Sequence, residues 1–590
     1  MADTDRPDAT VPPEAADILE AFLPFAALGI DDARLLLGGL VDALRTDPDR
    51  VRTFLEDRYS RQLALWQQVL GDASIAEDAA PADARFRDPA WHELPWFRWL
   101  RRQHALWTEF ANALPGVLEL SPTDRRRLAF ALRQWADAVS PTNFLGSNPS
   151  ALRRAFETEG QSVARGVAHW ADDLARGRIS MSDEAAFRVG VDLATTPGDV
   201  IHESPLAQLI HYTPTTPKLR ARPLLIVPPF INKFYILDLR PENSFVRFAV
   251  EQGFEVFMVS WRNVGPGQGD ATWDDYVREG VLDMLDVVLA TTHSRQAGVL
   301  GFCVGGTLAA TAAAIDAATG RHRIADLALL ATLLDFADPG DIAVYVDSTF
   351  VERSENEFRD GGVMPGTRLA AAFASLRARD LVWHFVEHNY LLGDTPPPFD
   401  LLHWNGDGAN LPGRLYCQYL RGMYLENRLR IPGGLSCLGH PVDLGAIDVP
   451  TYLLAAKDDH IVPWRSAFES TRLVPGADRF VLAESGHVAG VVNPATTNRR
   501  GFWHGPRPSG SAGEWLATAQ HTAGSWWHDW AAWHARRAGR WKAIHSGAGH
   551  GGATRHVIEA APGRYVLEQC HAGSSVGDSP RTTTDSKQDD

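Results

Sequence analysis

Three residues far apart in the chain have the types and order of a nucleophilic site: Cys303, Asp459 and His487. Cys303 lies in the run Gly-Phe-Cys-Val-Gly, which has the spacing of the Gly-x-Ser-x-Gly turn that exposes a serine nucleophile between a strand and a helix. Here cysteine replaces the serine. A thiol nucleophile needs a base to remove its proton and an acid to orient that base, which histidine and aspartate commonly provide.

Each of the three has a simpler structural interpretation when taken alone. A cysteine between glycines can fill a small core pocket, an aspartate after a strand can be a solvated loop acid or a helix cap, and a histidine there can be an ordinary loop residue. All three follow segments with strand-like sequences, and they occur in the order nucleophile, acid, base that α/β-hydrolases use. We therefore predict that Cys303, His487 and Asp459 form a triad.

The backbone around the cysteine would supply the rest of the site. A helix is predicted to begin directly after Cys303, and its N-terminus would stabilise the thiolate. The oxyanion hole is predicted from the backbone N–H of Val304 and one N–H after the first strand, at Phe230 or Ile231.

Alternating strands and helices must position these residues. The apolar runs RPLLIVPPF, FEVFMVSW, AGVLGF and LALLATLL predict buried parallel strands, and helical segments separate them. The alternation stops between residues 335 and 440, a stretch rich in aromatics, Pro and Gly, and resumes with the strands PTYLLAA and DRFVLA. The predicted fold class is α/β, a doubly wound and mostly parallel α/β-hydrolase sheet, with a lid insertion over the carboxyl ends of the strands.

The chain divides into four predicted parts. Residues 1–15 are expected to be disordered, and residues 16–200 to form an all-helical N-terminal domain. Residues 201–545 form the catalytic domain with the lid at about 335–440. Residues 546–590 form a C-terminal extension, disordered from about residue 571 because apolar residues are scarce there. The tryptophan-rich run at 525–541 predicts a helix packed against the core, with a hydrophobic surface for a polymer as the alternative.

Composition excludes several classes of protein. The net charge of −16 argues against a nucleic-acid binder. The four cysteines show no CxxC spacing and the 21 histidines no HExxH, so no metal site and no disulfide framework is expected. Neither a signal peptide nor an apolar run of about 18 residues is visible, so a cytoplasmic protein without a transmembrane segment is expected.

Long collinear motifs make the chain similar to the class I polyhydroxyalkanoate synthases. The resemblance extends from about Arg85 to Trp541, with a further match in APGRYV at 561–566. The motifs are RPLLIVPPFINKFYILDLRPENSFVRFAVEQGFEVFMVSWRN, TWDDY, LGFCVGGT, TLLDFADPG, NYLLGDTPPPFDLLHWNGDGANLPG, DVPTYLLAAKDDHIVPW and SGHVAGVVNP.

This resemblance implies an acyltransferase. In that family the cysteine of the lipase-like box is acylated, the aspartate of DHIVPW is the acid and the histidine of the GH-x-AG motif is the base; these correspond to Cys303, Asp459 and His487. Asp459 is chosen over Asp458 because it directly precedes His460, which would have a supporting role. The implied reaction joins (R)-3-hydroxyacyl-CoA units, short ones such as 3-hydroxybutyryl-CoA, into a polyester. CoA is part of the substrate and a product, and no separate cofactor is expected.

The resemblance also implies how the protein assembles. The N-terminal domain would serve dimerisation and attachment to polyester granules, and the lid would gate substrate entry. The expected partners are a second copy of the chain in a homodimer, the growing polyester and granule surface, and a phasin or activator protein. The expected location is the cytoplasm, on the granules.

A thioester substrate explains why a thiol replaces the usual hydroxyl. Attack by a thiolate exchanges one thioester for another, which is nearly thermoneutral and keeps the acyl group activated. A serine would form an oxygen ester and lose that driving force. Two alternatives remain open: a cysteine hydrolase of the same fold, such as a thioesterase, which would release free acid, and a granule-associated protein in which the triad is inert.

Overall fold

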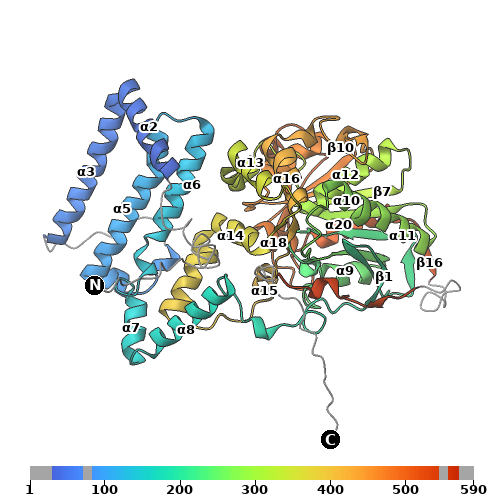
Figure 1. Ribbon diagram of the computed structural model, residues 1–590, viewed down its shortest axis with the longest axis horizontal. Helices are drawn as coiled ribbons and strands as arrows, with labels where there is room; N and C mark the ends of the chain where they lie inside the picture. The colour runs from blue at the N-terminus through green and yellow to red at the C-terminus, as the bar shows by residue number, and fades with distance from the viewer. Residues whose placement is uncertain (1–29, 71–82, 544–555, 571–590) are drawn as a thin grey trace, which may run out of the picture.

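A computed structural model describes residues 30–70, 83–543 and 556–570, which form a helical region and a domain built on one large sheet (Figure 1). The predicted disorder of residues 1–15 and of the tail from 571 falls outside the described residues, as does the start of the predicted helical domain.

The helical region covers the first part of the chain and has a small core of its own. Its main helices are α2 (Ile30–Thr46), α3 (Pro48–Leu70), α5 (Pro95–Val117), α6 (Pro122–Ala138), α7 (Pro149–Glu157) and α8 (Gln161–Arg176). Ala111, Leu118, Leu128 and Leu132 are buried between α2, α5 and α6. Helix α6 starts at Pro122 because Ser121 caps it by accepting a hydrogen bond from the backbone N–H of Asp124.

The sheet has eleven strands in the order β15-β14-β13-β12-β7-β6-β4-β5-β2-β1-β17. Its six central strands are parallel: β13 (Ala477–Ala483), β12 (Thr451–Ala456), β7 (Ile324–Leu330), β6 (Ala297–Phe302), β4 (Leu224–Val227) and β5 (Val256–Trp261). These are the six strands that the apolar runs predict. Since both faces of the centre are covered, alternate residues of one strand enter different cores: Leu225 and Val227 one, Leu224 and Ile226 the other.

Helices cover both faces of the sheet. On one face lie α10 (Trp273–Val277), α11 (Asp283–Thr292), α12 (Val304–Ala318) and α17 (Trp464–Glu469), and on the other α9 (Phe245–Glu251) and α20 (Trp527–Ala535). Trp526, Trp527, Trp530 and Trp533 are at most 2% exposed, so this tryptophan-rich run packs against the core, as predicted. Trp541, at the end of the run, is 48% exposed.

The edges of the sheet were not predicted. The strands β1 (Gly198–Glu203), β2 (Ala207–Tyr212) and β17 (Glu559–Ala560) form one antiparallel edge, and β14 (Gly501–His504) and β15 (Gln520–Ala523) form the other. Strand β1 starts at Gly198, inside the segment predicted to be helical, and β17 lies in the predicted C-terminal extension. A two-residue strand that pairs across more than three hundred residues has no local signature, because register with a distant edge stabilises it.

The insertion predicted as a lid is mostly helical and irregular. It contains α13 (Ser348–Glu357), α14 (Gly366–Leu376), α15 (Asp400–Gly406) and α16 (Gly413–Tyr419), and the π-helical segments η8 (Arg379–Trp383), η9 (Val386–Leu391) and η10 (Leu420–Leu425). In Figure 1, α14 lies between the helical region and the sheet domain.

The helical region holds the lid insertion through hydrogen bonds and close packing. Gln134 of α6 donates to the backbone carbonyl of Ser375 at 2.7 Å, and the Tyr390 hydroxyl donates to Asp173 of α8 at 2.7 Å. Helix α8 approaches so closely that a Cβ at Gly166 would lie 1.9 Å from the backbone oxygen of Tyr390. The lid is therefore supported from both sides, by the sheet and by the helical region.

We expect Gly166→Ala to loosen this contact and to lower the free energy of unfolding by about 1–3 kcal/mol, the usual effect of overpacking. The backbone of η9 would have to move, because a carbonyl oxygen occupies the space. Gly116→Ala is the matched control: Gly116 also lies in a helix and its Cβ would meet nothing within 4 Å. Thermal unfolding measures both variants, and equal melting temperatures would contradict the close contact.

Candidate active site

Cys303 occupies the sharp turn between β6 and α12, with φ 54° and ψ −127°. Residues other than glycine rarely adopt positive φ, and such strain persists only where the surroundings enforce it. The Cys303 N–H donates to the carbonyl of Leu330 at 2.9 Å, and its carbonyl accepts from the Gly306 N–H at 2.9 Å and from the Thr332 hydroxyl at 3.2 Å. The backbone of the cysteine is thus held on both sides.

The glycines after Cys303 allow α12 to pack directly against neighbouring backbone. A Cβ at Gly305 would lie 2.4 Å from the carbonyl oxygen of Val227, at the end of β4, and one at Gly306 would lie 2.0 Å from the Thr332 hydroxyl. The helix N-terminus is therefore adjacent to the thiol, where its dipole favours a thiolate.

His487 and Asp459 form a buried pair, and each follows a central strand of the sheet. Asp459 follows β12 and His487 follows β13, and His487 Nδ1 lies 2.7 Å from Asp459 Oδ2. The other carboxylate oxygen accepts hydrogen bonds from the backbone N–H groups of Ile461 at 2.9 Å and Val462 at 2.8 Å. The structure places Asp459, rather than the exposed Asp458, against the histidine.

The surroundings of His487 favour its protonated form. Burial disfavours the charged ring, but the Asp459 carboxylate and the Cys303 sulfur outweigh it, so the pKa of His487 lies well above its usual range. Because Nδ1 faces Asp459, Nε2 is left for the hydrogen-bonding contact with Cys303. The arrangement favours an imidazolium beside Cys303.

The structure also places the other predicted site residues. Ile231 lines the cavity at Cys303, whereas the Phe230 ring points into the core and packs on Tyr276 at 5.1 Å. Val304 is the first residue of α12, so no preceding helical turn supplies an acceptor for its N–H. Burial lowers the pKa of His460 to about 4, so this histidine is neutral at pH 7. The roles of Val304, Phe230, Ile231 and His460 remain predictions.

The lid insertion closes the cavity in which Cys303 and His487 lie. The cavity has a volume of about 80 Å³. Leu369, Ala370 and Phe373 of α14 and Trp404 of α15 form its roof. This space holds only a few water molecules and is too small for an extended substrate.

The remaining three cysteines lack such an environment. Burial raises the pKa of Cys417 to about 11 and also raises the pKa of Cys437, where the Asp274 carboxylate adds to the effect. Burial raises the pKa of Cys570 too. A raised pKa disfavours the thiolate, so these thiols are poor nucleophiles. Cys303 is the cysteine whose surroundings suit a nucleophile.

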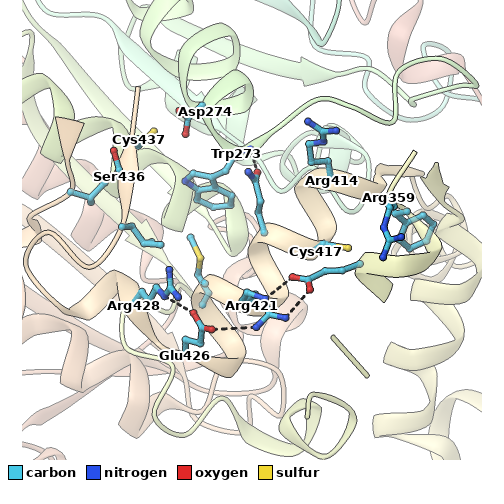
Figure 2. A pocket seen from close by; sticks show the side chains of 17 residues that line it. Trp273, Asp274, Arg359, Arg414, Cys417, Arg421, Glu426, Arg428, Ser436 and Cys437 are labelled. Carbon is cyan, nitrogen blue, oxygen red and sulfur yellow. Dashed lines mark hydrogen bonds and ion pairs between the residues drawn. The ribbon is translucent and has the colours of Figure 1, made fainter. Parts of the chain in front are cut away.

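A second cavity, of about 380 Å³, is lined by residues that include Trp273, Cys417 and Arg421 (Figure 2). Arg421 crosses it and binds Glu355 at 2.5 and 2.7 Å. It shares no described lining residue with the cavity at Cys303. Trp273 in its wall stacks on Tyr419 at 5.6 Å, and the half-buried Tyr419 lies near the Cys303 thiol. Sequence reasoning missed Tyr419, because nothing in its spacing separates it from the other lid aromatics.

Within the described ranges, no group of three His, Cys, Asp or Glu side chains could hold a metal ion. Nor does any helix there have the length and apolar character needed to cross a membrane.

Two family descriptions match the chain. Residues 82–249 match "Poly-beta-hydroxybutyrate polymerase (PhaC) N-terminus", and residues 223–494 match "alpha/beta hydrolase fold", which confirms the predicted fold class.

Curated relatives match over most of their length. "Poly(3-hydroxyalkanoate) polymerase subunit PhaC" of Cupriavidus necator is 46% identical over 519 residues, which is 87% of this chain and 87% of the relative. "Poly(3-hydroxyalkanoate) polymerase 2" of Ectopseudomonas oleovorans is 36% identical over 554 residues, covering 92% and 98%. Among solved structures, a hydrolase from Pseudomonas aeruginosa PA01 aligns with TM-score 0.30 and 17% identity, covering 50% of this chain and 92% of that one.

Asp459→Asn should slow the alkylation of Cys303 by iodoacetamide about tenfold or more at pH 7. The imidazolium loses a charged partner, and a charge-assisted hydrogen bond contributes roughly 1.5–3 kcal/mol. Asp458→Asn is the matched control and should react at the wild-type rate, because its side chain is exposed and does not contact His487. Peptide mapping separates Cys303 from the other thiols; equal or reversed effects would contradict the pairing of Asp459 with His487.

Proposed function

This chain belongs to the family of poly(3-hydroxyalkanoate) polymerases and is therefore an acyltransferase of polyester synthesis, and we propose that Cys303, His487 and Asp459 are its catalytic triad. The observation that carries this proposal is the strained Cys303 beside the buried His487–Asp459 pair, at the N-terminus of α12. The substrate is a (R)-3-hydroxyacyl-CoA thioester.

The first step is acylation of Cys303. The thiolate attacks the thioester carbonyl, the bond from carbon to the CoA sulfur breaks, and the leaving CoA thiolate takes the proton from the His487 imidazolium. A new thioester joins the acyl group to Cys303. The backbone N–H groups of Val304 and Ile231 are the donors for the oxyanion that forms on attack.

The second step forms the ester bond. Neutral His487 takes the proton of the 3-hydroxyl of an incoming hydroxyacyl-CoA, and the hydroxyl oxygen attacks the Cys303 thioester. The carbon–sulfur bond breaks and Cys303 leaves as the thiolate beside protonated His487. The chain, one unit longer and now a CoA thioester, acylates Cys303 again and releases CoA. Atoms and protons balance without any further cofactor.

The closed cavity supports polymerisation over hydrolysis. An acyl-enzyme survives only if water is kept away from it, and the roof formed by α14 and α15 shields Cys303. The small volume of about 80 Å³ also supports a preference for short acyl units such as 3-hydroxybutyryl.

Exposed apolar side chains on two helices of the helical region support a role for this region in granule attachment and in pairing of subunits. Leu37, Val41 and Leu44 form an exposed stripe on α2, and Leu55, Tyr59, Leu63 and Trp66 form another on α3. The spacing places each set on one helix face, and exposed apolar stripes of this kind mark interaction surfaces. We propose that they serve the homodimer and the granule surface.

Incubation of the purified protein with 3-hydroxybutyryl-CoA should release CoA while the solution becomes turbid with polyester. Free thiol and light scattering measured together test this, and Cys303→Ala should abolish both signals with an unchanged melting temperature. CoA release with free 3-hydroxybutyrate and no polymer would instead indicate a thioesterase. Polymer formation by Cys303→Ala at the wild-type rate would refute the assignment of the nucleophile.

A further inference from the structure

A chamber of about 570 Å³ adjoins the small cavity at Cys303. It lies between the end of α8, the lid helices α14 and α15, and the C-terminal segment up to Cys570. These helices lie where the helical region meets the sheet domain (Figure 1). Its volume is within the roughly 300–1,000 Å³ typical of ligand sites.

Four residues line both spaces and so separate them: Gly366, Ala370, Asn405 and Gly408. Three of the four are glycine or alanine. Gly366 fits tightly, since a Cβ there would lie 2.8 Å from the Cys570 sulfur. Asn405 has the one large side chain among these four, and its amide donates a weak hydrogen bond to the Met181 sulfur at 3.8 Å. A small displacement of this partition would join the chamber to the thiol.

Three exposed arginines line one part of the chamber: Arg176, Arg178 and Arg188. Arg176 and Arg178 both contact Glu184, at 3.6 and 2.7 Å, and Arg176 also contacts Asp172 at 3.9 Å. The Arg188 side chain is 74% exposed beside Asp192 at 3.6 Å. The chamber also has an apolar part to its lining, formed by Ile179, Met181, Leu381, Val382 and Val566. The buried acid there, Asp407, has a raised pKa because of its burial.

We propose that this chamber binds the CoA portion of the substrate, with the phosphates at Arg176, Arg178 and Arg188 and the pantetheine arm crossing the partition to Cys303. A charged end joined to a long neutral arm with a terminal thioester matches a chamber that is lined by three exposed arginines and by apolar side chains, because guanidinium groups bind phosphate in a bidentate way. A polyester chain is uncharged and would form no ion pairs with the arginines. The inference rests on the proposed function, and it assigns to the helical region a direct part in substrate binding.

The three arginines are tested together as a triple alanine variant, with 3-hydroxybutyryl-CoA and 3-hydroxybutyryl-pantetheine as the two substrates. We expect the KM for the CoA thioester to rise about tenfold or more and its kcat to stay unchanged. Kinetics with the pantetheine thioester, which lacks the nucleotide, should not change. Arg247→Ala is the control, because Arg247 is also an exposed arginine paired with one acid, Glu251, but lies on α9.

An unchanged KM for the CoA thioester, or an equal change for both substrates, would overturn the assignment. A change in polymer length with both substrates, at constant KM, would overturn it in favour of the polyester as occupant. These outcomes are distinct from failure of the proposed function, in which the wild-type protein itself would release no CoA.

The partition is tested at Ala370, which is exposed to the cavities it separates. Ala370→Phe should fill the passage and lower kcat/KM for both thioesters about tenfold or more. A melting temperature equal to that of the wild type establishes that the variant folds. Wild-type kcat/KM in Ala370→Phe would show that the substrate does not pass this way.

Discussion

The backbone of Cys303, with its positive φ, is the constraint on which the rest of the site depends. This conformation turns the chain from β6 into α12 within one residue, so that the thiol projects above the carboxyl ends of the parallel strands. It persists because hydrogen bonds to Leu330 and Thr332 hold the peptide groups on either side. A relaxed backbone there would turn the thiol away from both the helix N-terminus and His487.

The other parts of the molecule protect and complete this arrangement. Asp459 and His487 come from adjacent strands, so the register between β12 and β13 sets their separation. The lid insertion covers the cavity at Cys303, and the helical region supports that insertion at Ser375 and Tyr390. A closed site suits a thioester intermediate, but it also means that substrate enters only when the lid or the partition moves.

The centre of the fold and the candidate triad could be predicted from sequence because their signals are local. Buried strands are continuous apolar runs, and Cys303 lies in a five-residue pattern between a strand and a helix. The choice of Asp459 over Asp458 came from family resemblance, and the burial of Asp459 against His487 supplies a physical reason for it.

The edge strands, the contact of Gly166 with Tyr390 and the chamber beside Cys303 could not be predicted. Each depends on residues that meet only in the folded chain, and the side chains involved have no periodicity that reveals their partners. Glycine and alanine in the partition have no functional group from which a role could be predicted. They matter because their small size leaves space open.

The most direct test of the account is to find where the acyl group is attached during turnover. The protein is mixed with 3-hydroxybutyryl-CoA, quenched in acid within the first turnovers, digested and mapped by mass spectrometry. The account predicts a hydroxybutyryl or oligomeric adduct on the peptide that contains Cys303, removable by neutral hydroxylamine as a thioester is. An adduct on Cys417, Cys437 or Cys570, or CoA release and polymer formation without an adduct on Cys303, would contradict it.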